Sequence, residues 1–140
     1  MTTSRQMVEE NYSQADQKTK IPKNQMKALE LFDYWLNNLS EQNEMEVPEV
    51  KIVFCTMKND ERARTYYFYD EKFSIVQISK RATTDKWIER TIVHEIAHVL
   101  QFTKCDKEGI EIGKNKHNNL WKKIFKKSGI GTDYNFDIYS

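Results

Sequence analysis

The chain has 140 residues, of which 39% are hydrophobic, and a formal net charge of +1 from 22 basic and 21 acidic side chains. This length predicts one domain with a substantial core, and the near-neutral charge excludes a global electrostatic attraction to nucleic acid. The two cysteines, Cys55 and Cys105, belong to no CxxC pair, which argues against a disulfide framework and a cysteine-based zinc site.

The amino end is polar and charged and holds few apolar anchors. We expect a flexible polar arm over residues 1–20 and a single domain over residues 21–140. No apolar signal-peptide core stands at the amino end, and no later run approaches the length of a membrane span. The sequence therefore predicts an intracellular, cytoplasmic protein without membrane contact.

Apolar and aromatic residues recur at helical spacing from residue 24 to residue 42, with polar residues between them. This stripe predicts a packing helix, because such spacing is more typical of a core face than of a ligand site. After an acidic link comes the β-branched run Val50–Cys55. It predicts a strand that is buried on both faces, with Cys55 in the core.

A β-hairpin is predicted next. Arg62 and Arg64 lead into an aromatic run, and a short polar turn separates that run from residues 73–79. The two arginines could face an anionic substrate. We favour surface ion pairs with the nearby Asp60 and Glu61.

The second half of the chain predicts two helices. Thr84 and Asp85 supply an N-cap for Trp87–Phe102, which is apolar nearly all round and is therefore expected inside the protein. A polar connection, Lys104–Lys116, leads to a shorter helix over Asn118–Ser128 that is followed by glycine. Together these elements predict an α+β fold, with a small antiparallel or mixed sheet packed against three helices.

The buried helix carries the motif HEIAH, in which His94 and His98 lie one turn apart on the same face and can bind one metal ion. Glu95 occupies a neighbouring azimuth, where a carboxylate can reach a metal-bound water without being a ligand. Core histidines satisfied by hydrogen bonds are the alternative. We favour a metal, because a carboxylate buried among apolar residues is costly unless it has a function or a partner.

Zinc suits two imidazoles, and catalytic zinc usually takes a third protein ligand and one water. The spacing H-E-x-x-H-x-x-G-x-x-H is excluded, because its glycine and third histidine would fall at Gln101 and Lys104. His117, the remaining histidine of the chain, is the favoured third ligand of a single Zn²⁺. Glu108 and Glu111 stay open as alternatives.

HEIAH on a buried helix, followed by His117 with Trp121 four residues later, resembles the SprT-like zinc metalloproteases, the group that includes Spartan. The likeness extends over residues 24–128 and implies a zincin-like fold. Two departures stand out: Asn118 replaces the small residue, often glycine, that the family carries after its third histidine, and this sequence shows neither the cysteine-rich ribbon of bacterial SprT nor the partner-binding tail of Spartan.

These residues predict a zinc metalloendopeptidase in which Glu95 takes a proton from water and later passes it to the leaving amine. A protein or peptide substrate would add as an extended strand to an edge of the hairpin sheet. Two alternatives stay open. One is a zinc-containing binding or regulatory module that cleaves nothing, and the other is a repressor-cleaving zincin whose third ligand is a glutamate.

SprT-like proteases act on proteins bound or crosslinked to DNA, so the resemblance implies association with DNA and with the nucleoid or nucleus. Between Gly113 and Thr132 the chain holds six lysines and no acid. They could contact non-specific DNA, or form an ordinary solvated face. The six are Lys114, Lys116, Lys122, Lys123, Lys126 and Lys127.

Overall fold

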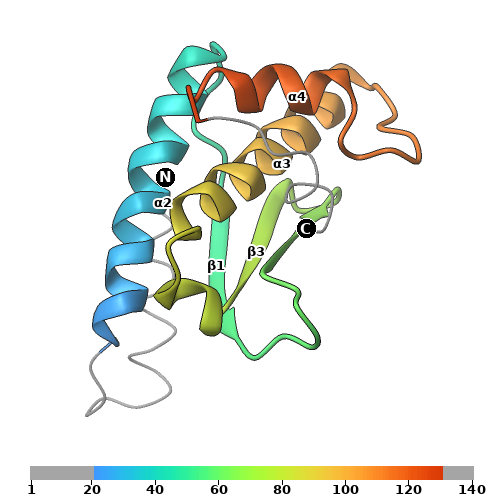
Figure 1. Ribbon diagram of the computed structural model, residues 1–140. Helices are drawn as coiled ribbons and strands as arrows, with labels where there is room; N and C mark the ends of the chain where they lie inside the picture. Colours follow the sequence, from blue (N-terminus) through green and yellow to red (C-terminus); the bar gives the residue numbers. More distant parts are fainter. Residues whose placement is uncertain (1–20, 131–140) are drawn as a thin grey trace.

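Over residues 21–130 the fold is α+β, with three helices and a small mixed sheet, and Figure 1 shows their arrangement. The structure is a computed structural model that describes residues 21–130, so the arm predicted for residues 1–20 lies outside the described residues, as do residues 131–140. In chain order the elements are α2 (Lys23–Gln42), β1 (Val50–Cys55), β2 (Ala63–Phe68), β3 (Phe73–Ser79), a 3₁₀ turn η1 (Arg81–Thr84), α3 (Ile88–Glu108) and α4 (Asn119–Lys126).

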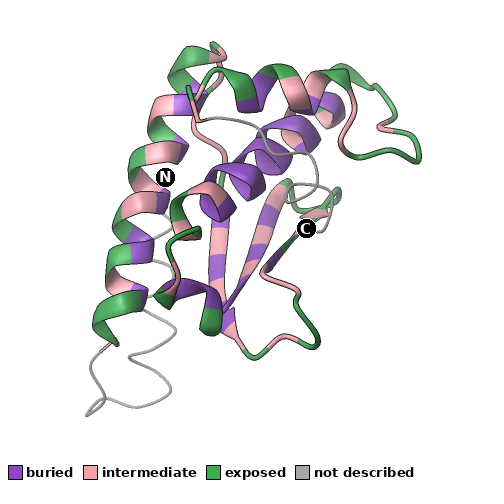
Figure 2. Cartoon of the chain, viewed as in Figure 1, coloured by how far each residue is buried: buried purple, intermediate pink, exposed green. Residues whose placement is uncertain are grey.

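The sheet has the strand order β1-β3-β2, with β1 parallel and β2 antiparallel to β3. The predicted hairpin and the predicted strand Val50–Cys55 are confirmed. That strand is not buried on both faces, however. Its burial alternates, because the helices cover one face of the sheet, and Cys55 points to the other face and is half-buried (Figure 2).

Helix α3 packs against α2, β2 and α4, and every residue from Thr91 to Phe102 is buried. The predicted interior position of this helix is confirmed, but its predicted end at Phe102 is wrong. The helix continues to Glu108, since the first residue suited to a left-handed cap is Gly109, with φ of +68°. The extra turns are tied to β2, because the Tyr67 hydroxyl donates to Asp106 at 2.6 Å.

The short helix α4 depends on the rest of the core. It has 8 residues, too few for a stable isolated helix, and its apolar face is fully buried through Trp121, Ile124 and Phe125. Figure 1 shows α4 lying across the carboxyl-terminal part of α3. Its position is therefore set by packing against α3. Within residues 21–130, no helix has the length and apolar character needed to cross a membrane.

The start of α3 is held by an ion pair that joins it to the hairpin. The Arg62 guanidinium bonds both oxygens of Asp85, and its Nε donates to Thr91 Oγ1 at 2.9 Å. The expected pairing with the nearby acids is therefore wrong for Arg62, whereas Arg64 does pair with Glu61, at 2.6 Å. Asp85 lies before α3, and its Oδ1 accepts a hydrogen bond from the Trp87 N–H at 2.7 Å. Trp87 precedes the first residue of α3, so the predicted side-chain N-cap of the helix is not formed.

Replacing Asp85 by asparagine should destabilise the fold in a pH-dependent way. Arg62 holds the pKa of Asp85 below its usual value, so the stabilisation is fully present above the unfolded-state pKa of about 3.9 and fades as the pH falls through the folded-state value. A partly exposed, charged hydrogen-bonded pair contributes about 1–2 kcal/mol. Urea unfolding of Asp85→Asn should show this loss at pH 7 and a much smaller one near pH 3.

Asp60→Asn is the matched control, because Asp60 is an exposed aspartate in the turn before the same hairpin. It should leave the free energy of unfolding unchanged at both pH values. An Asp85→Asn protein as stable as wild type at pH 7 would contradict the role given to the ion pair.

Candidate metal centre

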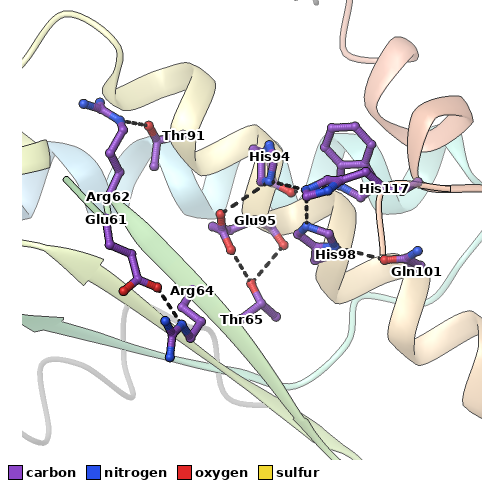
Figure 3. Close-up of polar contacts among 11 residues, drawn as sticks. Glu61, Arg62, Arg64, Thr65, Thr91, His94, Glu95, His98, Gln101 and His117 are labelled. Carbon is purple, nitrogen blue, oxygen red and sulfur yellow. Dashed lines mark hydrogen bonds and ion pairs between the residues drawn. The ribbon is translucent and has the colours of Figure 1, made fainter. Parts of the chain in front are cut away.

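The side chains of the three histidines of the chain converge, with one ring nitrogen of each close to the other two. His117 Nε2 lies 3.1 Å from His94 Nε2 and 3.2 Å from His98 Nε2, and the three rings form a group that could hold a metal ion (Figure 3). Ligand nitrogens about 2.0–2.1 Å from a tetrahedral metal stand about 3.3 Å apart. The donor set therefore fits a tetrahedral ion with three imidazole ligands.

Two elements supply these ligands. His94 and His98 lie one turn apart on α3 and are buried, as the motif predicts, and half-buried His117 lies two residues before α4. Neither Glu108 nor Glu111 belongs to the group. Glu108 instead pairs with Lys104 across one helical turn, with 3.2 Å between Oε1 and Nζ. The structure thus brings together the histidine set and not the glutamate alternatives.

Burial prepares His98 for the ligand role. Loss of solvent, and after it the neighbouring His94, lower the pKa of His98 well below its usual value. The ring is therefore neutral at physiological pH, and a neutral imidazole is the form that binds a metal.

Gln101 fixes which nitrogen of His98 is available. Its Oε1 lies 3.0 Å from His98 Nδ1, while its Nε2 donates to the Lys116 carbonyl at 2.8 Å and to Asn118 Oδ1 at 3.0 Å. Since the amide oxygen accepts from Nδ1–H, Nε2 keeps the lone pair that a metal needs. The same side chain ties α3 to the segment that carries His117.

Gln101 is a residue of the site that the sequence did not predict. The available signal was a polar residue three positions after the second histidine, inside a run that is otherwise buried and apolar. Asn118, which the sequence marks only as a departure from the pattern of the SprT-like family, also has a structural role. Asn118 is the N-cap of α4, and its Oδ1 accepts from the Trp121 N–H at 3.1 Å.

Trp121 forms the apolar wall of the site. Its ring centroid lies 4.7 Å from that of His94, 5.5 Å from His98 and 4.8 Å from His117, and its Nε1 donates to the His94 carbonyl at 3.3 Å. A single buried side chain of α4 therefore contacts all three rings and limits the orientations they can take.

Glu95 lies beside the histidine nitrogens but is not part of the ligand group. It is fully buried; its Oε1 accepts a hydrogen bond from Thr65 Oγ1 at 2.8 Å, and its Oε2 lies 3.9 Å from His94 Nε2 (Figure 3). Strand β2 thus orients the carboxylate through Thr65, a second residue that the sequence analysis missed because it is 30 positions away.

A groove of about 500 Å³ adjoins the centre. One side is β2, and the other is formed by Phe102 and the connection between α3 and α4, including Glu111, Ile112 and Lys116. Two of its lining residues contact the site: Thr65 bonds Glu95, and the ring of Phe102 stacks on His98 with 5.6 Å between ring centroids.

The six lysines named above fall into two groups around this centre. Lys114 and Lys116 are exposed on the connection that precedes His117, and Lys122, Lys123, Lys126 and Lys127 lie on or directly after α4. Lys122 is half-buried and the others are exposed, with Lys127 Nζ donating to the Gln42 carbonyl at 3.1 Å. The segment that carries His117 and Trp121 thus presents a basic surface to solvent.

Comparison with known proteins gives no match: no family model, no curated protein and no solved structure is similar to the chain. The case for function therefore rests on the motif and on the geometry of the centre.

Gln101→Leu should weaken metal binding by about 10–100-fold, since an orienting partner of a histidine ligand typically contributes that much. Leucine fills the same space but neither accepts from His98 nor holds the Lys116 carbonyl. Affinity for Zn²⁺ can be measured by competition with a chromogenic chelator. The control is Gln25→Leu, which removes another buried glutamine, on α2 and outside this network. Equal affinities in the two variants would contradict the role of Gln101.

Proposed function

We propose that the protein is a zinc-dependent metalloendopeptidase with His94, His98 and His117 as ligands and Glu95 as the general base. One observation carries the proposal: three imidazole nitrogens converge beside a buried carboxylate, and residues that contact this site also line a groove along strand β2. This combination of ligands, base and substrate space is what a zincin needs, and it agrees with the resemblance to SprT-like proteases.

Zinc is the metal that suits this donor set best, because it binds neutral imidazole and adopts tetrahedral geometry readily. When bound, it supplies a Lewis acid that lowers the pKa of a coordinated water and polarises a carbonyl group. His94, His98 and His117 would hold the ion, and within residues 21–130 no fourth residue belongs to their group.

Glu95 holds and moves the proton in this proposal. Its carboxylate accepts a proton as water attacks the scissile carbonyl and then delivers that proton to the amine that leaves. Thr65 restricts the carboxylate to an orientation close to the histidine nitrogens. The buried surroundings keep other water away and strengthen the electrostatic interactions within the site.

The substrate in this proposal is an extended polypeptide. Within residues 21–130, β2 is an edge strand, since its inner edge pairs with β3 and no other strand pairs with it. An exposed strand edge next to a catalytic centre can bind a peptide through main-chain hydrogen bonds. The contact of Thr65 with Glu95 places that edge next to the proposed base.

Proteins bound or crosslinked to DNA are the substrate class that we propose for this activity. The basic surface around α4 supports it, because it lies on the segment that supplies His117 and Trp121. Lysines of this kind neutralise phosphates and read no base sequence, so DNA binding would be non-specific.

Glu95→Gln should abolish proteolysis while zinc remains bound. Glutamine preserves the size of the side chain but cannot accept the proton, so the rate should fall by at least about 100-fold. The measurement is cleavage of an unfolded DNA-binding protein by zinc-loaded protein, together with zinc content per chain. Full activity in a zinc-loaded Glu95→Gln protein would refute the assignment of the base.

Ligand variants complete this experiment. His117→Ala should lose tightly bound zinc and activity together, whereas Glu108→Ala and Glu111→Ala should keep the zinc content of wild type. Loss of zinc from a glutamate variant, with zinc retained in His117→Ala, would instead support a glutamate ligand. Zinc-loaded wild type that cleaves none of the proteins offered would favour a binding module.

Replacing Lys122, Lys123, Lys126 and Lys127 by glutamine should weaken DNA binding uniformly across sequences. Each lost phosphate contact should lower the slope of log K against log salt by about one. Fluorescence anisotropy with labelled duplexes over a range of salt measures this slope. The control replaces four exposed lysines away from α4, Lys23, Lys27, Lys58 and Lys80. Equal slopes in the two variants would remove the DNA surface from the proposal.

A further inference from the structure

The groove beside β2 has a lining that can distinguish one substrate side chain from another. This inference rests on the protease activity proposed above. The pairing of β2 with β3 determines the direction in which the backbone groups of β2 point. In an antiparallel pair, hydrogen-bonded and non-hydrogen-bonded residue pairs alternate along the ladder. Ser79 N–H donates to the Arg62 carbonyl at 2.8 Å, so the ladder begins with a hydrogen-bonded pair.

The alternation then assigns each residue of β2 to one edge. Arg64 and Tyr66, which stand opposite Gln77 and Ile75, direct their N–H and C=O groups toward β3. Ala63, Thr65 and Tyr67 consequently direct theirs toward the outer edge. A peptide that adds to this edge therefore forms its main-chain hydrogen bonds with Thr65 and Tyr67.

The same residues direct their side chains toward α3. Thr65 contacts Glu95, and Tyr67 donates to Asp106, about three helical turns further along. Directly opposed residues of neighbouring strands project their side chains to the same face of a sheet. The peptide residue opposite Thr65 therefore lies beside the proposed base. The residue opposite Tyr67, two positions away, directs its side chain into the groove.

At that position the groove is mainly apolar and aromatic. Its walls include Phe102 and Ile112, and the ring of Tyr67 lies on the strand side. Burial and the bond to Asp106 raise the pKa of the Tyr67 hydroxyl, so it stays neutral. The two charged lining residues, Glu111 and Lys116, have opposite signs, so the lining carries no net charge that would select a charged side chain.

We infer that the groove is a specificity subsite that selects a large aromatic or aliphatic side chain, two residues from the substrate residue beside Glu95. Ile112 is the determinant best suited to a test. It is half-buried in the wall, and its side chain takes part in neither the metal centre nor its supporting hydrogen bonds. Its backbone carbonyl accepts from Asn118 Nδ2 at 3.4 Å, and a substitution leaves that carbonyl in place.

The experiment compares Ile112→Glu with Ile110→Glu. Ile110 is the matched control, because it lies on the same connection, is 55% exposed and does not line the groove. Zinc-loaded proteins are offered a peptide mixture, and the residues on both sides of each cut are counted. Wild type and Ile110→Glu should favour phenylalanine, tyrosine, leucine or methionine at one position, within three residues of the cut.

Ile112→Glu should lose this preference, with kcat/KM for an aromatic peptide falling by about tenfold or more relative to its alanine counterpart. Zinc content should match wild type in both variants, which separates a changed subsite from a damaged centre. Cleavage by wild type with no preference, or a preference that Ile112→Glu retains, would overturn the subsite and leave the protease proposal standing.

A second measurement tests the subsite without cleavage. Zinc-loaded Glu95→Gln should bind a fluorescent peptide with a central phenylalanine more tightly than the matched alanine peptide, and Ile112→Glu in that background should remove the difference. If this difference in binding is present but wild type cleaves no peptide, the proposed protease function is wrong and the subsite stands. Equal binding of the two peptides would overturn the subsite.

Discussion

The attachment of the segment carrying His117 to the middle of α3 is the constraint on which the centre depends. Two ligands lie on one rigid, buried helix, but the third lies in a connection that has no regular structure of its own. Gln101 bonds that connection through the Lys116 carbonyl, and Trp121 packs against all three imidazoles. Because α4 is too short to be stable alone, its docking and the assembly of the ligand set are one event.

This dependence accounts for the polar side chains that are buried at the centre. Gln101, His94 and Glu95 have no solvent exposure, and each would be costly in a core without a partner. In this fold Gln101 forms hydrogen bonds with His98, the Lys116 carbonyl and Asn118. The Thr65 hydroxyl donates a hydrogen bond to the carboxylate of Glu95. A metal bound by the three histidines would add binding free energy to the docking of α4, so metal binding should stabilise the fold as well as the site.

The sequence predicted what local patterns determine. Periodicity gave the two long helices and the three strands, and HEIAH gave the face shared by His94 and His98. Local sequence patterns do not predict contacts between segments that are far apart in the chain. Arg62 was expected to pair with its neighbours and instead bonds Asp85, 23 residues away. The predicted helix end at Phe102 is wrong because a polar stretch does not by itself end a helix, and the left-handed cap comes only at Gly109.

Strand β2 links the proposed base to the edge at which the proposed substrate would bind. Thr65 bonds the carboxylate of Glu95 with its side chain, while its backbone N–H and C=O belong to the edge at which a peptide would add. Sliding of β2 along β3 by two residues would carry Thr65 and the peptide register away from Glu95, because the carboxylate belongs to α3 and would not move with the strand. Tyr67, bonded to Asp106 on α3, opposes such sliding at the other end of the strand. The hairpin would therefore align a bound peptide with the proposed base through one short strand that α3 holds at both ends.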